Sequence, residues 1–380
     1  MNKSECATEA QNSKFINNGV KGVWHRPNSS ERETNLDELR IVLDEFKEAG
    51  INLVFLETFY HGMAVYKTDL VDYHIKLEGF DYGEYPDYLS AFMVEAEKRG
   101  ISVYAWVQDF YIGFRDYIRL VTERPEWLLI NQQGEIRHLT EGQGFGGYIF
   151  LDPANPEVRD FLISVYDDIL TKYPNIKGLN LDYIRYPISE IEEGTDTGYT
   201  KASMREFAEK QGLEIDDNIS VAEFNKIIVD GGLADEWTAH RAAYVTGFVE
   251  GVRKMINEKH RGKLISTAVF AEVGQTYHLK KQNIKVWLDN GYVDFVTPMV
   301  YFYEAEQIFE SVSKMKAMCG GIPCYSGLYT TYHNQTTSEL AEHIKASERA
   351  GAEGFVLFDA AKTFFEAKED YRGVLSRLND

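Results

Sequence analysis

The 380-residue sequence contains few cysteines and no long apolar run. Its three cysteines, Cys6, Cys319 and Cys324, are too scattered for a disulfide framework or a zinc-binding pattern. Cys319 and Cys324 are close enough in sequence to pair, but we expect buried free thiols. No apolar stretch reaches about 18 residues, so the sequence predicts no membrane span.

Several motifs for metal or cofactor chemistry are also missing. The nine histidines form neither an HExxH motif nor an HxH pair at a strand end. A GxSxG nucleophile elbow and a phosphate-binding Walker loop are absent. We therefore expect no metal and no cofactor.

Basic residues are fewer than acidic residues: the chain has 40 lysines and arginines and 60 aspartates and glutamates, which gives a net charge of −20. No basic footprint exists to neutralise phosphates, which argues against nucleic acids and anionic membranes as partners. An acidic surface suits neutral or cationic ligands, although it can also serve solubility alone. Aromatic residues make up 13% of the chain, and their rings can stack on sugars or fill a core.

The first 19 residues, MNKSECATEAQNSKFINNG, contain no apolar signal segment and are predicted to form a disordered leader. If this start is native, we expect a cytoplasmic protein. If a signal or lipoprotein leader preceded it, we expect a secreted or cell-envelope protein. The sequence does not indicate an oligomeric state.

Short apolar runs alternate with helical patterns along the rest of the chain. Eight continuous apolar runs predict strands covered on both faces: residues 20–26, 52–58, 101–107, 176–183, 264–270, 293–301, 322–329 and 354–360. The intervening helices show start and stop signals: Thr34 or Asn35, Pro86 and Pro156 at their starts, and Gly50, Gly100 and Gly351 at their ends.

This alternation predicts a single (β/α)8 TIM barrel over residues 20–380. A doubly wound open sheet is the alternative, but no glycine-rich phosphate loop follows the first strand. Connections 108–154 and 184–233 are too long for ordinary loops and follow the carboxyl ends of strands three and four. The second contains the helical pattern KASMREFAEKQG and is predicted to form a lid or small subdomain.

Acidic residues collect at the predicted carboxyl ends of the strands, where barrel enzymes build their sites. They are Glu57, Asp109, Asp182, Glu272 and Asp359. Cleavage of a glycosidic bond needs one carboxylic acid to protonate the leaving oxygen and a second carboxylate to attack the sugar or activate water. Acids and aromatic rings at one mouth are therefore typical of a glycosidase.

Six segments resemble, in this order, the bacterial glycosyl hydrolase-like family ten, which is distinct from the family 10 xylanases: GVWHRP, INLVFLETFYHGMAVY, RGISVYAWV, FLDPANPEVRDFL, GLNLDYIRYP and VDFVTPMVY. The resemblance covers roughly residues 20–360. It implies a TIM barrel, glycoside hydrolase activity on cell-wall glycans or other polysaccharides, and Asp182 as the leading catalytic carboxylate. Some members carry two consecutive acids at this motif, whereas Tyr183 takes the second place here.

Each candidate acid has a functional and a structural interpretation. Asp182 is a catalytic acid or nucleophile, or it forms a structural ion pair with Arg185, which would also keep it ionised. Glu272 is the predicted proton donor, by analogy with α-amylase-type barrels, or else a solvated loop acid. Glu57 and Asp109 are each a second acid or a sugar-hydroxyl acceptor, or hydrogen-bond to a neighbouring strand.

The remaining candidates would bind substrate. Trp106, Tyr183 and Tyr301 are predicted stacking rings or barrel packing, and His25 is a sugar-hydroxyl partner or a structural histidine. We also expect Arg185 to bind substrate. We expect Asp152 to help start a helix and not to take part in catalysis. A glycoside hydrolase is the leading interpretation, with a transglycosylase or a non-catalytic glycan-binding barrel as alternatives.

Overall fold

The computed structural model describes residues 19–28, 30–330, 335–367 and 369–377. The predicted leader lies outside these residues up to residue 18, and so does Cys6. In the described part of the chain, Cys319 and Cys324 are buried free thiols, as predicted. No helix in this part is long and apolar enough to span a bilayer.

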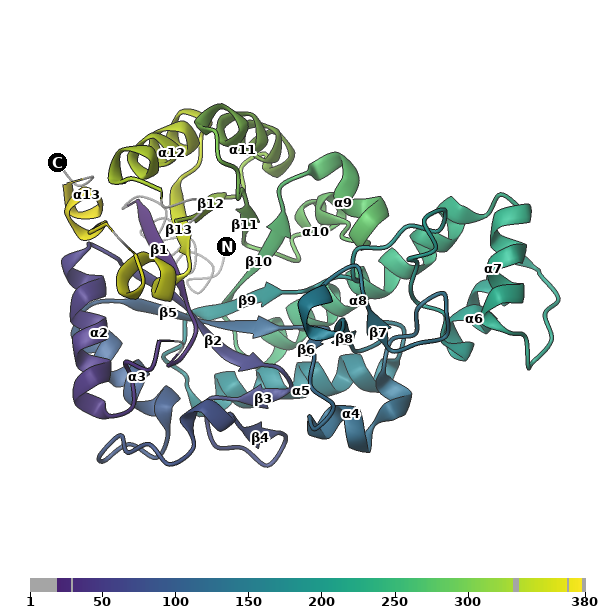
Figure 1. Cartoon of the computed structure of the whole chain (residues 1–380), viewed down its shortest axis with the longest axis horizontal. Helices are drawn as coiled ribbons and strands as arrows, with labels where there is room; N and C mark the ends of the chain where they lie inside the picture. The colour runs from purple at the N-terminus through teal and green to yellow at the C-terminus, as the bar shows by residue number, and fades with distance from the viewer. Residues whose placement is uncertain (1–18, 29, 331–334, 368, 378–380) are drawn as a thin grey trace.

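Within the described residues, eight parallel strands close into a barrel (Figure 1). They are β1 (Val20–His25), β2 (Leu53–Tyr60), β5 (Ser102–Gln108), β9 (Gly178–Asp182), β10 (Leu264–Phe270), β11 (Phe295–Met299), β12 (Tyr325–Tyr329) and β13 (Gly354–Phe358). Because β1 pairs with both β2 and β13, the ring is closed. The predicted TIM barrel is confirmed, and the open sheet is excluded.

Helices surround the barrel (Figure 1). They include α2 (Leu36–Glu48), α3 (Tyr88–Lys98), α5 (Pro156–Lys172), α8 (Ala234–Lys259), α9 (Val273–Lys280), α10 (Ile284–Asp289), α11 (Ala305–Cys319), α12 (Thr337–Arg349) and α13 (Arg372–Arg377). Asn35 caps α2, and Pro156 is the first residue of α5, as predicted. The prediction for Pro86 is wrong by two positions, because α3 begins at Tyr88 with Asp87 as its cap, and Pro86 precedes the cap.

Asp152 lies in the turn before α5, where it accepts a hydrogen bond from the Ala154 N–H. The cap of α5 is Asn155, so Asp152 contributes to the turn and not to the cap itself. Its second oxygen accepts a hydrogen bond from the Thr200 hydroxyl, which ties this turn to the second insertion.

The two long insertions form local structure on the carboxyl-end side of the barrel. Residues 108–154 contain α4 (Arg119–Glu123) and a three-stranded antiparallel sheet of β6 (Tyr111–Gly113), β8 (Tyr148–Phe150) and β7 (Arg137–His138). Residues 184–233 contain α6 (Lys201–Gln211) and α7 (Val221–Asp230), which project to one side in Figure 1. These helices and the start of α8 share an apolar cluster separate from the barrel core. The lid role of this insertion stays a prediction.

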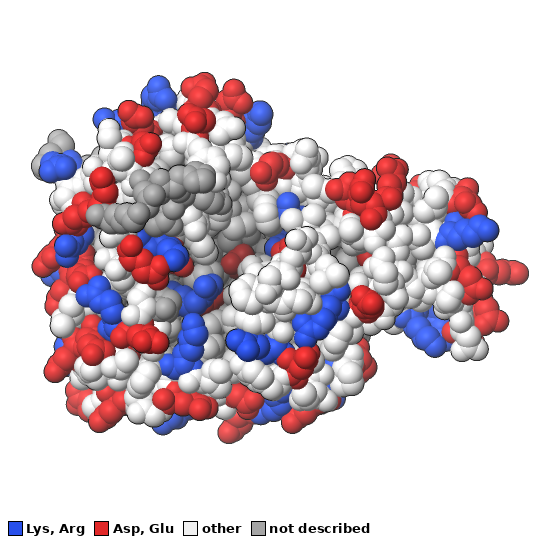
Figure 2. All heavy atoms as spheres, viewed as in Figure 1, with Lys and Arg blue, Asp and Glu red and all other residues white. Residues whose placement is uncertain are grey.

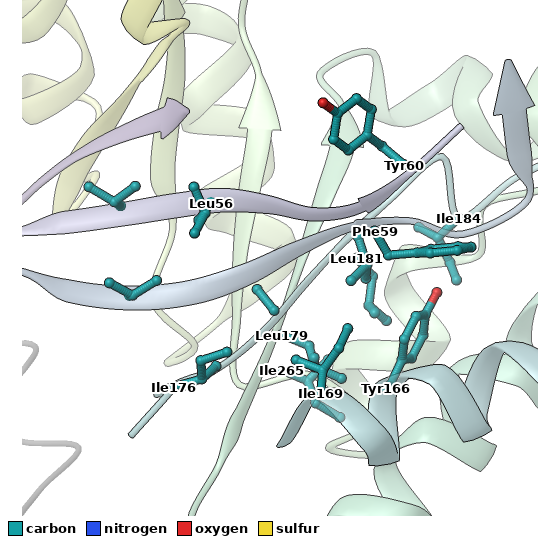
Figure 3. Close-up of a cluster of buried hydrophobic side chains, with 14 of the residues drawn as sticks. Leu56, Phe59, Tyr60, Tyr166, Ile169, Ile176, Leu179, Leu181, Ile184 and Ile265 are labelled. Atoms are coloured by element: carbon teal, nitrogen blue, oxygen red, sulfur yellow. The ribbon is translucent and has the colours of Figure 1, made fainter. Parts of the chain in front are cut away.

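Side chains of each strand alternate between the barrel interior and the surrounding helices. One set fills the interior: Trp24, Phe55, Tyr104, Trp106, Phe295, Tyr325 and Val356. The other set packs under the helices, and Figure 3 shows part of this layer with strand residues Leu56, Leu179, Leu181 and Ile265 beside α5 residues Tyr166 and Ile169. The same two-residue period decides which strand-end residues face the mouth.

Candidate functional site

At the end of β1, Arg26 and not His25 belongs to the mouth. Trp24 lies in the barrel interior, so the next residue, His25, points outward. His25 is fully buried, lies 2.9 Å from Glu33 Oε1 through its Nε2, and stacks on Phe92 of α3. The structure therefore places this predicted sugar contact behind the barrel wall.

Glu57 forms the buried base of the mouth. The Arg26 Nε donates to Glu57 Oε2, and Arg26 Nη2 and Gln108 Nε2 donate to Oε1 at 3.1 and 2.8 Å. The Glu57 side chain has no exposed surface, whereas 29% of the Arg26 side chain is exposed. Glu57 thus holds Arg26 toward the opening, and its hydrogen-bond partners come from the ends of the neighbouring strands β1 and β5.

Glu57 and Arg26 influence each other's ionisation. Burial raises the pKa of Glu57, and the Arg26 guanidinium opposes that rise through attraction and hydrogen bonding. Burial alone would lower the pKa of Arg26, but Glu57 and Asp359 raise it above its ordinary value. Arg26 therefore brings a fixed positive charge into the mouth.

Asp182 ends β9 at the floor of the mouth and is 9% exposed. Its Oδ2 accepts a hydrogen bond from Trp106 Nε1 at 3.0 Å, and its Oδ1 accepts one from the Tyr183 N–H at 2.7 Å. Burial raises the pKa of Asp182, while these two hydrogen bonds, Arg185 and Arg26 oppose the rise. The carboxyl group is thus held in one orientation with a shifted pKa, as expected of a functional acid.

Arg185 does not form the predicted ion pair with Asp182. Its Nη1 and Nη2 donate to the two oxygens of Glu141, from the first insertion, at 2.7 and 2.8 Å. Its guanidinium also lies 4.7 Å from the centre of the Tyr183 ring. Arg185 therefore joins the two insertions beside the mouth and acts on Asp182 only through its charge.

Asp359 follows β13 and is a third carboxylate near Arg26. It is 8% exposed, and its Oδ1 accepts a hydrogen bond from the Lys362 N–H at 3.0 Å. Its charge acts on both Arg26 and Glu57. Asp182 and Asp359 are thus the mouth carboxylates that keep some exposed surface.

Asp109 lies on the outer side of the barrel wall. It follows Gln108, which faces the interior, so its side chain points toward α5, where the Tyr166 hydroxyl donates to Oδ1 at 2.5 Å. It has no exposed surface, and its Oδ2 has no partner among the described residues. Burial raises the pKa of Asp109 well above its usual range. The structure does not bring this predicted second acid into the mouth.

Glu272 lies outside the hydrogen-bonded cluster around Asp182. It is exposed at the start of α9 and lines a separate hollow of about 400 Å³ with Gln307, Glu310 and Lys314. Its role as proton donor stays a prediction that no contact with Asp182 in the described residues supports.

Aromatic rings line the side of the mouth opposite the first insertion. Tyr301, Tyr329 and Phe358 are half-buried, with ring centroids 5.5–6.0 Å apart. Trp106 is only 1% exposed, so it holds Asp182 through its indole N–H and has little free ring surface. Tyr183 is half-buried beside Asp182. Figure 2 shows a hollow near the ends of β2, β5 and β9, with acidic and basic atoms around it.

The candidate site therefore differs in part from the one predicted. The structure brings together Asp182, Glu57, Trp106 and Tyr183 from the predicted site, with Asp359 from the predicted strand-end acids, and it adds Arg26 and Gln108. The period-two alternation of each strand was the signal that distinguishes Arg26 from His25 and Gln108 from Asp109. In the described residues, no group of three or more metal-ligating side chains gathers.

A closed (β/α)8 barrel with carboxylates, an arginine and aromatic rings at its mouth defines a TIM barrel of the glycosidase type. The chain belongs to the glycosyl hydrolase-like 10 family, whose model matches residues 19–342. This confirms the resemblance found in the sequence.

Two relatives show how far the likeness extends. The chain is 25% identical over 260 residues to an S-layer-related protein of Niallia circulans, covering 60% of this chain and 16% of that protein. It is 22% identical over 284 residues to glycosyl hydrolase DigH of Escherichia coli K12, covering 68% of this chain and 56% of that protein. The chain thus spans only part of the length of these relatives.

Two solved structures share the fold. The GH42 β-galactosidase Gan42B from G. stearothermophilus superposes with a TM-score of 0.63 at 13% identity, covering 95% of this chain and 56% of that chain. A β-galactosidase from the psychrophilic Marinomonas ef1 gives 0.60 at 13% identity, covering 94% of this chain and 58% of that chain. At such identities the likeness establishes the fold alone.

Proposed function

We propose that this protein hydrolyses a glycosidic bond in a polysaccharide or cell-wall glycan at the carboxyl-end mouth of its barrel. The observation that carries the proposal is the position of Asp182. Its carboxyl group lies at the floor of the mouth, oriented by Trp106 Nε1 and the Tyr183 N–H, and its charge interacts with those of Arg26 and Glu57. The family and the glycosidase-type fold support this activity.

In this proposal Asp182 is the proton donor to the leaving glycosidic oxygen. Burial raises the pKa of Asp182, which is the direction of shift that favours a proton donor. Asp359 is the second carboxylate, because it keeps exposed surface whereas both oxygens of Glu57 are occupied by Arg26 and Gln108. Glu57 positions Arg26, whose charge can orient the substrate. Glu272, which lines the separate hollow, is the alternative second acid.

The half-buried rings of Tyr183, Tyr301 and Tyr329 would contact the sugar faces in this site. Because water or a sugar can accept the glycosyl group, a transglycosylase would use the same residues. Product analysis in the presence of an acceptor sugar separates the two reactions.

A non-catalytic glycan-binding barrel is the second candidate. It is favoured by one observation, the complete occupation of Glu57 by Arg26 and Gln108, which removes one predicted acid from the chemistry. Such a protein would keep the arginine and the rings and would bind glycans without turnover.

The test is hydrolysis of a glycan library by the wild type, Asp182→Asn and Asp359→Asn in parallel, with circular dichroism as a check of folding. We expect each variant to lose about 10²-fold or more in turnover while it still binds glycan. Equal turnover by the wild type and Asp182→Asn would remove Asp182 from the mechanism. Glycan binding without turnover by the wild type would establish the binding barrel instead.

A further inference from the structure

A nearly buried lysine at the end of α9 lacks an acceptor for its ammonium group. Lys280 is 6% exposed, and its Nζ forms no hydrogen bond or ion pair with any residue that the structure describes. Its Nζ instead lies 3.5 Å from the centroid of the Phe270 ring. Charged side chains are rarely buried to this extent without a partner, so Lys280 departs from the usual arrangement.

The other buried lysines and arginines of the described residues differ from Lys280, because each of them donates to an oxygen atom. Their acceptors are Leu375 O for Lys21, Glu141 for Arg185, Asp196 for Arg241, and Ser189 Oγ and His278 O for Lys281. Lys281 is the most direct comparison, since it follows Lys280 in the chain and is itself only 1% exposed. Burial alone therefore does not explain the missing acceptor.

Lys280 lies at the β9–β10 side of the mouth. Phe270 is the last residue of β10, and it follows by two positions Ala268, which belongs to the barrel interior, so its ring faces the mouth. The Arg185 guanidinium lies 5.1 Å from the centroid of the same ring and 4.7 Å from that of Tyr183. Two cations therefore share one ring of the mouth wall, close to the candidate acid that precedes Tyr183.

The charges that the structure describes around Lys280 do not replace an acceptor. Burial and the charge of Arg185 lower the pKa of Lys280, whereas the charges of Glu272 and Glu141 raise it. Both Glu141 oxygens accept hydrogen bonds from Arg185, and neither of these two carboxylates forms an ion pair with Lys280. The Phe270 ring offsets only part of the lost hydration, so the acceptor has to come from water or from a bound molecule.

A purely structural role would not require the positive charge of Lys280. An unbranched apolar side chain would pack on Phe270 without the cost of removing a charge from water. Replacement of buried ionic groups by apolar residues of similar volume is often neutral or stabilising. Groups that lower the stability of the folded chain are retained where activity requires them. A charge kept at this cost in the wall of the mouth indicates a bound molecule as its partner.

We propose that Lys280 is a substrate-binding residue whose ammonium donates to an oxygen atom of a sugar unit bound at the β9–β10 side of the mouth. This inference rests on the proposed function, and it adds a residue that selects the substrate through that oxygen. An ammonium group has three N–H donors, and hydrogen bonds from a charged donor are about twice as strong as those between neutral groups. A sugar hydroxyl and a carboxylate on the sugar share the required chemistry, and the test separates them.

The test measures binding of cellohexaose, chitohexaose and a galacturonic acid hexamer to protein carrying Asp182→Asn, so that the probes stay intact. We expect Lys280→Met to weaken binding of the neutral hexamers about tenfold if the acceptor is a hydroxyl, and of the galacturonic acid hexamer alone if it is a carboxylate. Chemical denaturation should show unchanged or higher stability, because the Met side chain keeps the Phe270 contact without a buried charge. The matched control is Lys281→Met, which loses two hydrogen bonds and should lower stability without changing affinity.

Several outcomes would overturn this role of Lys280: affinity for all three hexamers unchanged by Lys280→Met, an equal loss of affinity in Lys281→Met, a loss of stability as large as that of Lys281→Met, or no binding of any hexamer. Failure of the proposed function is separate. If Lys280→Met weakens binding but hydrolysis does not depend on Asp182, the binding role stands and the catalytic proposal fails.

Discussion

The hydrogen bond from Trp106 Nε1 to Asp182 Oδ2 links a barrel-core residue directly to the proposed acid. The indole N–H stabilises the ionised carboxylate, so it limits the rise in the pKa of Asp182 that burial causes. A second tryptophan of the barrel interior, Trp24, makes a similar bond, but its Nε1 donates to the neutral Asn180 Oδ1 at 3.0 Å. The two indoles therefore differ chiefly in the charge of their acceptors.

We predict that Trp106→Phe raises the pKa of Asp182, because the ring packing is kept while a donor to the charged form is lost. If Asp182 is the general acid, activity falls as it loses its proton, so the alkaline limb of the pH–rate profile moves to higher pH. A hydrogen bond to a charged group predicts a shift of about one pH unit. Measurement of kcat/KM against pH checks this.

Trp24→Phe is the matched control. It removes an indole N–H from the same barrel interior, and it should lower stability without moving the alkaline limb. A limb that stays in place in Trp106→Phe, or that moves equally in both variants, would contradict the role given to the Trp106 bond.

At the residue scale, the sequence predicted which strand ends place polar side chains near the mouth but assigned two of these side chains to the wrong face. His25 and Asp109 each lie one position away from a residue that faces the mouth. A continuous apolar strand buried on both faces hides its alternation, because both neighbours are apolar. Trp24 and Trp106, as large inward residues, could have set the register.

At the scale of elements, close approach of neighbouring strands sets the choice of glycine in the barrel. Gly178 begins β9 opposite Leu264 of β10. An added Cβ at Gly178 would lie 1.9 Å from the Leu264 carbonyl oxygen. The position of the added Cβ is fixed by the Gly178 backbone, and the oxygen belongs to the backbone of the paired strand. No rotation of a side chain can therefore relieve the clash.

Gly178→Ala is therefore predicted to destabilise the protein by about 3 kcal/mol or more, because the β9–β10 pair must separate. Chemical denaturation followed by circular dichroism measures the change. Gly247→Ala, in the middle of α8, is the control, and its expected change in stability has the opposite sign. Nothing lies within 4 Å of a Cβ added at Gly247. Alanine there should stabilise the helix by about 0.5–1 kcal/mol. Wild-type stability of Gly178→Ala would show that the strands are not packed this closely.

The order and type of the elements were predictable from alternating apolar runs and helix caps, but contacts between the insertions were not. Arg185 lies three residues after Asp182, and this spacing suggested an ion pair between them. The structure pairs Arg185 with Glu141, 44 residues earlier in the chain. Such a contact depends on how two insertions meet in space, which local spacing does not encode.

At the scale of the whole molecule, the charge is distributed unevenly with respect to the mouth. The chain carries a net charge of −20, and acidic side chains are scattered over the face in Figure 2, with uncharged surface and basic side chains between them. The mouth itself contains Arg26 among carboxylates and beside uncharged rings. Long-range repulsion should therefore oppose anionic glycans even where local contacts could accept them.

We predict that binding of cellohexaose to Asp182→Asn protein changes by less than about twofold between about 50 and about 500 mM NaCl, because stacking and hydrogen bonds to a neutral chain are not screened. An anionic chain of similar length, a galacturonic acid hexamer, should bind more weakly at low salt and gain affinity as screening shortens the range of the acidic field. Isothermal titration calorimetry at the two salt concentrations measures both. The control is a reduced or uncharged ester of the same hexamer, which should lose the salt dependence. Stronger binding of the anionic chain at low salt would mean that the local charge of Arg26 outweighs the acidic surface, and the preference for neutral glycans would then be wrong.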